Sequence, residues 1–378
     1  MKQVGRTLRI WYVGGGTGGH IFPLFAVERQ VRALCAARNI ACTGLLITGR
    51  TARERSWVAD HPIAAYHIHG GKLRRYVSIR NITDLALIAA GMLESLLLFL
   101  FRRPDVIFSK GGYISVPPLL LARLFSVRTV LHESDLTLGL ANRICAPLTD
   151  TLCLNQQYTV GTLSPSSRRK AVVTGLPSRL EGEQQEPVDV FRRFSLDPAR
   201  PLITVIGGSL GAMRINQLIP GLYEAMEGSV QIVHQSGQGR TAAVSPEEIR
   251  ISGSGYVRIP FLAEEYQDLL KASVCVISRA GASAIADYLA LQVPMLLIPL
   301  PLSASRGDQI ENADLYEKAG CALVFDNDTV SASTLAEAVR TLVENPVMLQ
   351  QMREHMKGLY RSDASNAIAQ ILVDGTGR

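Results

Sequence analysis

Two glycine-rich segments follow short apolar runs and are the first candidates for chemistry. GGGTGGH (14–20) follows the run at 8–13, and GGSLGA (207–212) follows the run at 202–206. A glycine loop between a strand and a helix presents backbone N–H groups and a helix N-terminus to an anion. The first loop lacks a clean dinucleotide fingerprint, and the second lacks the Lys-Ser/Thr ending of a P-loop. A single loop of this kind is often only a tight turn, whereas two in succession indicate nucleotide-binding α/β domains.

His20 closes the first glycine loop, where the following helix is expected to begin. An imidazole there lies near a bound phosphate or hydroxyl and accepts a proton near neutral pH. His20 is therefore the candidate general base. A helix-capping or structural histidine is the alternative that the loop alone leaves open.

Other predicted strand ends also carry polar residues. SKGGY (109–113) places a hydroxyl and an ammonium beside two glycines, which suits phosphate contacts or a simple turn. His132 lies at a further strand end beside Glu133 and Asp135. The Asp-Asn-Asp at 326–328 resembles an Asp-x-Asp metal site, but its place between a strand-like run and a helix start predicts a turn.

The chain has 378 residues, of which 47% are hydrophobic, and this excludes intrinsic disorder and suits two domains. Helical stretches separate the β-type runs, which predicts parallel sheets with helices on both faces. The polar segment 181–189 marks a domain boundary, and residues 363–372 predict a closing helix. The remaining β-type runs cover residues 44–49, 105–112, 129–134 and 151–155 in the first half and 230–237, 257–261, 274–281 and 294–300 in the second.

Charge is divided unequally along the chain. Residues 1–180 hold 23 Lys and Arg against 9 Asp and Glu, whereas residues 181–378 hold 16 against 24. The apolar run at 85–101 contains Glu94 near its middle, so we expect a buried or interfacial helix instead of a membrane span. Together with the basic segment 72–80, this run predicts a membrane-docking surface, with a core helix as the alternative.

The six cysteines form no CxxC pair and no Cys/His cluster with metal-ligand spacing. A reduced, cytoplasmic protein with buried thiols is therefore expected. The first apolar stretch is too short for a signal peptide before glycines interrupt it.

Seven segments together resemble the MurG family of N-acetylglucosaminyltransferases. The resemblance implies the GT-B fold, an α/β architecture of two Rossmann-like parallel-sheet domains facing a cleft. It implies an acceptor-binding and membrane-associating domain at 1–177, with the helix 363–378 returning to it, and a UDP-sugar domain at 178–362. The segments are GGGTGGHIFPLFAV (14–27), SKGGYISVPPLLLARL (109–124), HESDLTLGLANR (132–143), GGSLGAMRINQ (207–217), HQSGQG (234–239), SRAGASAIAD (278–287) and SRGDQIENA (305–313).

The resemblance also assigns site residues, position by position. Those implied to face the acceptor diphosphate are Gly15, Gly16, Gly111, Gly112 and Tyr113. Those implied to bind the donor are Thr17, Gly18, Gly19, Asp135, Arg179, Ser209, Leu262, Ala282, Ser283, Ala284, Ile285, Ala286, Asp287, Asp308 and Gln309.

Three of these positions depart from the commonest family pattern. Asp135 stands in place of an asparagine that contacts the acetamido sugar, and it keeps an acceptor oxygen but donates no amide hydrogen. Asp287 replaces the longer glutamate that holds the ribose hydroxyls, and Asp308 replaces the first of two glutamines. These changes leave the reaction class in place and bear on the identity of the donor.

The family's reaction is an inverting transfer of N-acetylglucosamine from UDP-GlcNAc to undecaprenyl-diphospho-N-acetylmuramoyl-pentapeptide. The resemblance therefore implies that UDP-GlcNAc, the lipid-linked acceptor and an anionic membrane surface are partners, with no nucleic acid, metal or cofactor. It implies a peripheral position on the cytoplasmic side of the cell membrane. The alternatives are another GT-B enzyme, such as a diacylglycerol glycosyltransferase or a UDP-GlcNAc 2-epimerase, and a membrane-associated UDP-sugar sensor without catalysis.

Overall fold

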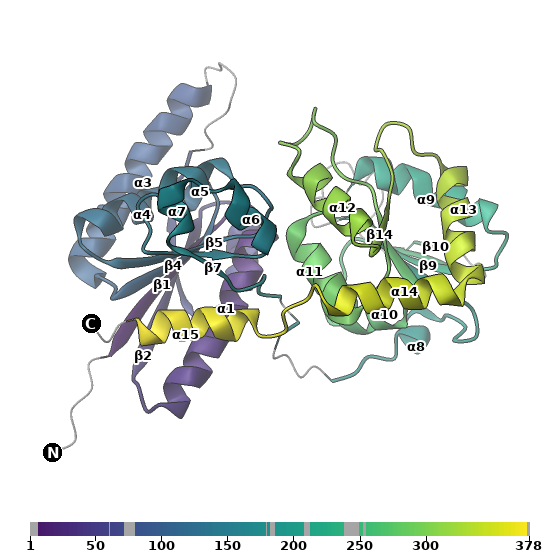
Figure 1. The fold of residues 1–378 in the computed structure, drawn as a ribbon, viewed down its shortest axis with the longest axis horizontal. Coiled ribbons are helices and arrows are strands. Elements are labelled where there is room, and N and C mark those ends of the chain that lie inside the picture. Colours follow the sequence, from purple (N-terminus) through teal and green to yellow (C-terminus); the bar gives the residue numbers. More distant parts are fainter. Residues whose placement is uncertain are drawn as a thin grey trace. The chain divides into compact units, whose positions relative to one another are not determined.

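The computed structural model describes residues 7–59, 61–71, 80–178, 180–181, 186–207, 212–237, 249–251 and 255–375, with backbone alone for 80–82 and 249–251. The chain divides into two compact units, drawn in Figure 1. Unit 1 comprises Met1–Glu181 and Arg361–Arg378, and unit 2 comprises Gly182–Tyr360.

Unit 1 is built on a seven-stranded sheet of order β3-β2-β1-β4-β5-β6-β7, in which every pairing is parallel. Alternate side chains of β1 enter different cores, because successive residues of a strand face opposite sides of the sheet. Ile10 and Tyr12 pack in one core, and Trp11 and Val13 pack in the other. The strands are β1 (Leu8–Gly14), β2 (Cys42–Gly49), β3 (Ala64–Ile68), β4 (Val106–Gly111), β5 (Arg128–Glu133), β6 (Thr151–Leu154) and β7 (Ala171–Val173).

Helices cover both faces of this sheet (Figure 1). Ile368 and Leu372 of α15 enter the same core as α1, so the end of the chain packs on its beginning. Leu98 and Phe99 of α3 enter the opposite core. The helices are α1 (Gly18–Ala37), α2 (Ala52–Ala59), α3 (Arg80–Arg102), α4 (Val116–Leu124), α5 (Leu140–Cys145), α6 (Gln157–Thr162), α7 (Pro165–Arg168) and α15 (Ala364–Asp374), with a 3₁₀ turn at Tyr113–Ser115.

Helix α3 contains the apolar run that the sequence singles out. Within the described residues, Thr83–Arg102 is the one stretch long and apolar enough to cross a membrane, by length and composition. Its central carboxylate, Glu94, is tied to the domain: Arg50 Nη2 donates to Oε1 at 2.7 Å, and the main-chain N–H of His69 donates to Oε2 at 2.7 Å. The helix is therefore packed on unit 1 along one face.

Unit 2 repeats the parallel design with the strand order β10-β11-β9-β8-β12-β13-β14. Only the β10–β11 pairing among the described strands of this sheet is antiparallel, and it lies at the edge. The strands are β8 (Leu202–Ile206), β9 (Gln231–Gln235), β10 (Ile249–Ile251), β11 (Tyr256–Ile259), β12 (Cys275–Ser278), β13 (Met295–Leu297) and β14 (Ala322–Val324). The helices are α8 (Val190–Phe194), α9 (Met213–Ala225), α10 (Tyr266–Ala272), α11 (Ala282–Leu291), α12 (Asp308–Lys318), α13 (Ala332–Glu344) and α14 (Pro346–Lys357).

Two parallel-sheet α/β domains, as expected from the alternating runs, are thus confirmed. Strands β3, β7 and β10 escaped the sequence analysis because they have only three to five residues, lie at sheet edges and so carry no long apolar run. Of the six cysteines, all are free thiols and only Cys42 is less than fully buried. The predicted Asp-Asn-Asp turn is also present, since Asp326 Oδ1 accepts the N–H groups of Asp328 and Thr329 at 3.0 Å.

Candidate active site

Three sequence motifs of unit 1 meet at the carboxyl ends of neighbouring strands. The first glycine loop follows β1, SKGGY spans the end of β4, and the His132–Asp135 segment (HESD) spans the end of β5. Because β1, β4 and β5 are adjacent and parallel, their carboxyl ends lie along one edge of the sheet. This edge is where open α/β sheets bind ligands.

The first glycine loop and the SKGGY loop are in direct contact. Gly112 has φ +83°, and a side chain there would place its Cβ 2.7 Å from the Gly15 carbonyl oxygen and 3.4 Å from His20 Nδ1. Gly16 also has a positive φ, +92°, and faces the ring of Tyr113. Glycine is required at both positions, since L side chains rarely adopt this conformation and the space is occupied.

Glu54 holds the first glycine loop, a role that the sequence analysis missed. Its side chain is buried, and Oε1 accepts the N–H of Gly16 at 2.6 Å. Oε2 accepts the Thr51 hydroxyl at 2.6 Å and the Thr51 N–H at 3.3 Å. The sequence does carry a signal for this role. Glu54 comes shortly after the carboxyl end of β2, and β2 is the neighbour of β1 in the sheet.

His20 lies in the first turn of α1, half-buried, beside Thr17. Its Nδ1 is 3.0 Å from Thr17 Oγ1, and its main-chain N–H donates to the Thr17 carbonyl at 3.1 Å. When Nδ1 carries the proton and donates it to Thr17, Nε2 is the basic nitrogen of the ring. The geometry is thus compatible with the role of a base that Thr17 orients.

The turn after β5 is organised by Glu133. Its Oε1 accepts the N–H groups of Ser134 at 2.8 Å and Asp135 at 3.0 Å. Its Oε2 accepts the N–H of Gly139 at 2.9 Å and the side-chain amide of Asn142 at 2.9 Å. One buried carboxylate therefore fixes the segment that carries Asp135.

The ammonium of Lys110 is buried beside this turn. Lys110 of β4 is 1% exposed, and its ammonium donates to the Ser134 hydroxyl. Burial lowers the pKa of Lys110 to about 8, and the carboxylates of Glu133 and Asp135 oppose this shift.

His132 is a structural residue and not a second base. Its Nε2 lies 2.9 Å from the Gly175 carbonyl oxygen, which makes that nitrogen a donor. Burial holds the pKa of His132 well below its usual range, and the charge of Lys110 adds to the effect. A neutral, fully enclosed imidazole of this kind cannot reach a substrate proton.

Two expected donor contacts lie outside the described residues. These are Arg179 and Ser209, the second of which belongs to the glycine loop 207–212. The basic segment 72–80 is also outside the part of the chain whose side chains the structure describes.

The start of α11 carries most of the donor residues expected in unit 2. Ala282, Ser283 and Ala284 form its partly exposed first turn, whereas Ile285 and Ala286 point into the core. Asp287 is buried, and its Oδ2 accepts the hydroxyl of Tyr266 at 3.1 Å. The shorter carboxylate at this position is therefore held from α10, a contact that the sequence does not reveal.

The other expected donor positions in unit 2 are Leu262, Gln309 and Asp308. Gln235 Oε1 accepts the main-chain N–H of the buried Leu262 at 2.9 Å. Gln309 Oε1 accepts the N–H of Leu300 at 3.0 Å. Asp308 begins α12 and pairs with Arg306 at 3.7 Å.

Arg279 connects the carboxyl ends of β12, β13 and β14. Its Nη1 donates to the carbonyls of Ile298 and Pro299 at 2.8 and 3.1 Å and to Asn327 Oδ1 at 2.7 Å. Burial lowers the pKa of this guanidinium. Among the described residues, no cluster of three or more His, Cys, Asp or Glu side chains is arranged to hold a metal ion.

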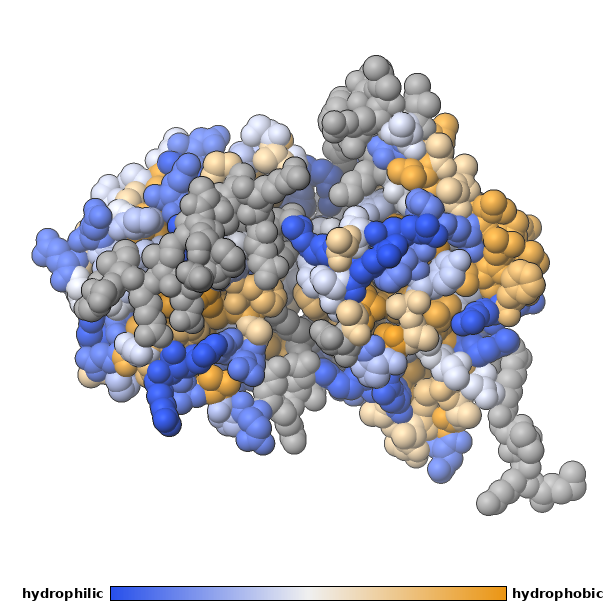
Figure 2. All heavy atoms as spheres, turned by 180° about the vertical axis from the view of Figure 1, so that it is seen from behind, coloured by the Kyte–Doolittle hydropathy of each residue, from blue (hydrophilic) through white to orange (hydrophobic). Residues whose placement is uncertain are grey.

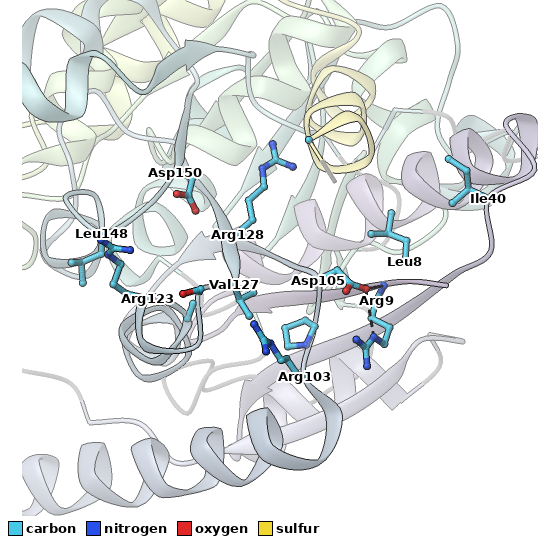
Figure 3. Close-up of a pocket in the computed structure, with 14 residues that line it drawn as sticks. Leu8, Arg9, Ile40, Arg103, Asp105, Arg123, Val127, Arg128, Leu148 and Asp150 are labelled. Atoms are coloured by element: carbon cyan, nitrogen blue, oxygen red, sulfur yellow. Dashed lines mark hydrogen bonds and ion pairs between the residues drawn. The ribbon is translucent and has the colours of Figure 1, made fainter. Parts of the chain in front are cut away.

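A cavity of about 820 Å³ lies elsewhere in unit 1, at the amino ends of the strands (Figure 3). Arg9 of β1, Arg128 of β5 and Asp150, which directly precedes β6, line it. The guanidinium of Arg128 is used by the fold, since it donates to the carbonyls of Ile371 and Leu372. The cavity is thus at the opposite edge of the sheet from the glycine loop.

Models of known families match both halves of the chain. The glycosyltransferase family 28 N-terminal domain matches residues 10–152, and the glycosyltransferase family 28 C-terminal domain matches residues 202–370.

Curated relatives match over nearly the whole chain. A protein of Lachnospira eligens is 34% identical over 368 residues, which are 96% of this chain and 97% of that protein. A protein of Legionella pneumophila is 32% identical over 97% of this chain and 96% of its own length. Both are named UDP-N-acetylglucosamine–N-acetylmuramyl-(pentapeptide) pyrophosphoryl-undecaprenol N-acetylglucosamine transferase.

Solved structures share the fold. Acinetobacter baumannii MurG has a TM-score of 0.70 at 22% identity and covers 97% of this chain and 99% of its own. A putative UDP-N-acetylglucosamine 2-epimerase from Listeria monocytogenes has a TM-score of 0.68 at 12% identity, covering 99% and 98%.

Proposed function

The chain belongs to glycosyltransferase family 28, and we infer that it transfers N-acetylglucosamine from UDP-GlcNAc to undecaprenyl-diphospho-N-acetylmuramoyl-pentapeptide. The similarity at 34% identity over 96% of the chain carries this conclusion. The transfer completes the lipid-linked precursor of peptidoglycan, and so serves cell-wall growth, cell shape and cell division.

In this proposal, unit 1 binds the lipid-linked acceptor. The glycine loop after β1 and the SKGGY loop adjoin each other, and we assign the acceptor diphosphate to main-chain N–H groups of these loops other than that of Gly16, which Glu54 accepts. The residues proposed to face it are Gly15, Gly16, Gly111, Gly112 and Tyr113. Burial, with the nearby charge of Glu54, raises the pKa of Tyr113 to about 12, so its hydroxyl stays a neutral donor.

Unit 2 binds the donor in this proposal. The first turn of α11 suits the UDP diphosphate. Asp287 suits the ribose hydroxyls, and the backbone of Leu262 suits the uracil. Gln309 is assigned to the sugar, together with Thr17, Gly18, Gly19 and Asp135 of unit 1.

The reaction requires a base and a stabilised leaving group. The acceptor C4 hydroxyl attacks the anomeric carbon of the α-linked sugar, the bond to UDP breaks, and a β-1,4 bond forms. His20 takes the hydroxyl proton, while Arg179, Ser209 and loop N–H groups stabilise the charge that grows on the departing diphosphate.

We place the membrane contact on α3. Phe101 is 81% exposed, and Leu124 at the end of α4 is 74% exposed. Figure 2 shows hydrophobic side chains gathered along an edge of unit 1. The remaining exposed apolar residues of α3 are Leu85, Leu87, Leu93, Leu97 and Leu100. An apolar face of this size, with Arg102 in the last turn of α3 and Arg123 in the last turn of α4, suits peripheral attachment to an anionic bilayer.

Vesicle binding tests this placement. Replacing Leu97 and Phe101 together by Ser should weaken co-sedimentation with anionic vesicles by tenfold or more, since each buried apolar side chain contributes about 1.5–3 kcal/mol. Leu302→Ser, which removes an exposed leucine of unit 2, is the control. Equal binding of all three proteins would exclude α3 as the docking helix.

Labelled UDP-GlcNAc and a short-chain lipid acceptor test the reaction itself. Transfer of label to the lipid supports the proposal. Epimerised sugar nucleotide without acceptor, or transfer to diacylglycerol, would replace it with another GT-B activity. Donor binding with no turnover would leave a UDP-sugar sensor.

A further inference from the structure

The cavity at the amino ends of the unit 1 strands has no part in the proposed transfer, yet charged side chains line it (Figure 3). Its volume of about 820 Å³ is within the range of small-molecule sites. Arginines outnumber aspartates in its lining by two, so the surplus of positive charge favours an anionic ligand. The arginines are Arg9, Arg103, Arg123 and Arg128, and the aspartates are Asp105 and Asp150.

The two aspartates do not account for the four arginines, because both carboxylates hold strands. Asp105 Oδ2 accepts the main-chain N–H of Arg9 at 2.8 Å, and the Arg9 side chain pairs with the same oxygen at 3.5 Å. Asp150 Oδ2 accepts the N–H and the hydroxyl of Thr129 at 2.8 and 3.1 Å. Hydrogen bonds from such donors stabilise a carboxylate without a further counter-ion.

Two of the arginines have a structural use at helix ends. Arg128 donates to the carbonyls of Ile371 and Leu372 in the last turn of α15, and Arg103 Nη2 donates to the Phe125 carbonyl, just after α4, at 2.5 Å. Among the described residues, this is the one side-chain hydrogen bond of Arg103. Since a guanidinium has five N–H donors, most of those of Arg103 are left for a ligand.

Arg123 has no structural use of this kind. In the part of the chain that the structure describes, its guanidinium makes no hydrogen bond and no ion pair. Arg123 lies in the last turn of α4, whereas Arg103 follows the end of α3 (Figure 3). Two separate elements therefore bring cations with unused donors to one cavity.

Apolar side chains complete the lining and indicate what kind of anion fits. Leu8, Ile40, Val127 and Leu148 all border the cavity. A bare ion needs no apolar wall and far less room, whereas an organic phosphate uses both the charged and the apolar parts of such a site. The planar guanidinium fork also matches the oxygens of a phosphate group in a bidentate geometry.

We propose that this cavity is a second ligand site, which binds an organic phosphate through Arg103 and Arg123. The inference goes beyond the transfer reaction and uses none of the residues assigned to donor or acceptor. The phosphate belongs either to a phospholipid headgroup or to a soluble phosphate ester. A headgroup is one of the two sources because the exposed Phe101 and Leu124 lie close to these arginines in the chain.

Titration calorimetry of the full chain tests the site. The probes are glycerol 3-phosphate and dihexanoyl-phosphatidylglycerol, the latter below the concentration at which it forms micelles, with saturating UDP present to fill the proposed donor site. Arg123→Gln should weaken binding of a probe by about tenfold to a hundredfold, as expected for the loss of charge-assisted hydrogen bonds to phosphate. Arg103→Gln should have a similar effect. A phosphate bound at the carboxyl edge of the sheet would not respond to these variants, so the difference from the parent reports the cavity.

The two probes also separate the two sources. Tighter binding of the short-chain lipid identifies a headgroup, and equal binding of both probes identifies a soluble phosphate ester. Inorganic phosphate that binds as tightly as either probe would overturn the assignment to an organic ligand. Failure of both probes to bind the parent would overturn the site itself.

Arg169→Gln is the matched control. Arg169 is an exposed arginine just before β7, at the same edge of the sheet, but it does not line the cavity. Its replacement removes the same charge and should leave binding of the probes unchanged. Equal losses in Arg169→Gln and Arg123→Gln would mean that the probes respond only to the overall charge of unit 1, and the proposal would fail. Arg123→Gln breaks no contact to a described residue, and thermal unfolding without a probe checks that each variant is folded.

Discussion

The two units hold their carboxyl-edge loops with groups of different charge, carboxylates in unit 1 and a guanidinium and neutral amides in unit 2. In unit 1, the carboxylates of Glu54 and Glu133 accept N–H groups from the loops. In unit 2, the guanidinium of Arg279 donates to the carbonyls of residues 298 and 299. The difference follows from which backbone groups each loop has in surplus. The loops of unit 1 are rich in glycine and present N–H groups, whereas Ile298 to Pro301 contains two prolines, which have no N–H and leave carbonyls to satisfy.

The comparison has a chemical consequence. The carboxylate anchors place negative charge beside the proposed acceptor loops. This charge increases the proton affinity of a general base there, and a bound diphosphate needs a nearby positive charge to offset it. Anchors that are cations or neutral amides suit a site for a nucleotide diphosphate. The predictions below test this contrast in order of expected effect.

The largest effect is expected for the candidate base of unit 1. His20→Ala should lower kcat by about 10²–10⁴-fold, the usual contribution of general-base catalysis. Donor affinity should change much less, because UDP is assigned to unit 2. Steady-state kinetics over a range of pH measures this. A fall of less than tenfold with an unchanged acidic limb would leave His20 with a role in loop shape only.

Removing an anionic anchor should come next. Glu54→Gln keeps the size of the side chain but cannot accept from Gly16 and Thr51 at once, so we expect a loss of about 1.5–3 kcal/mol in the free energy of unfolding. Transfer should fall by about tenfold, because the glycine loop shifts. Chemical denaturation and the lipid assay measure the two effects.

Glu28→Gln is the matched control for this variant. Glu28 is also buried, but its partner is Arg32 one turn away on α1 and not a loop N–H. Equal losses of stability and of transfer in the two variants would show that any buried carboxylate of unit 1 has this effect. The effect could then not be assigned to the hold of Glu54 on the glycine loop.

The cationic anchor of unit 2 should affect the donor and not the acceptor. Arg279→Met leaves the carbonyls of Ile298 and Pro299 without their donor, so we expect about 1–3 kcal/mol of destabilisation and a severalfold higher KM for UDP-GlcNAc. Arg340→Met, which removes a single exposed contact to the Ala225 carbonyl, is the control. A raised acceptor KM with an unchanged donor KM would contradict the division of roles between the units.

The smallest effect is expected at Asp287. Tyr266→Phe removes one hydroxyl that donates to its carboxylate and leaves the ring in the core. Donor affinity should change by a few fold at most, since one hydrogen bond contributes about 0.5–1.5 kcal/mol. Isothermal titration with UDP measures it. A loss of a hundredfold would mean that the tyrosine hydroxyl is itself part of the nucleotide site.

Much of the fold could be predicted from local patterns. The first strand–glycine–helix opening, the strand and helix on either side of the second glycine segment, the long apolar strands and the turn at 326–328 depend on residues close in sequence. Each of these is found as expected. The sequence analysis identified SKGGY and His132 as strand-end motifs but did not predict which strands are neighbours; the strand order puts SKGGY next to the first glycine loop and the His132–Asp135 segment one strand further along the same edge.

The sequence by itself determined the two-domain α/β plan, the family and the loops proposed to bind phosphate, because glycine spacing and apolar runs act locally. Only the tertiary structure showed what holds those loops. Glu54 reaches Gly16 across 38 positions, Gln235 reaches Leu262 across 27, and Arg279 reaches Asn327 across 48. Such pairs carry no fixed spacing, since they form only when separate strands bring their ends to one edge and burial leaves each polar group in need of a partner.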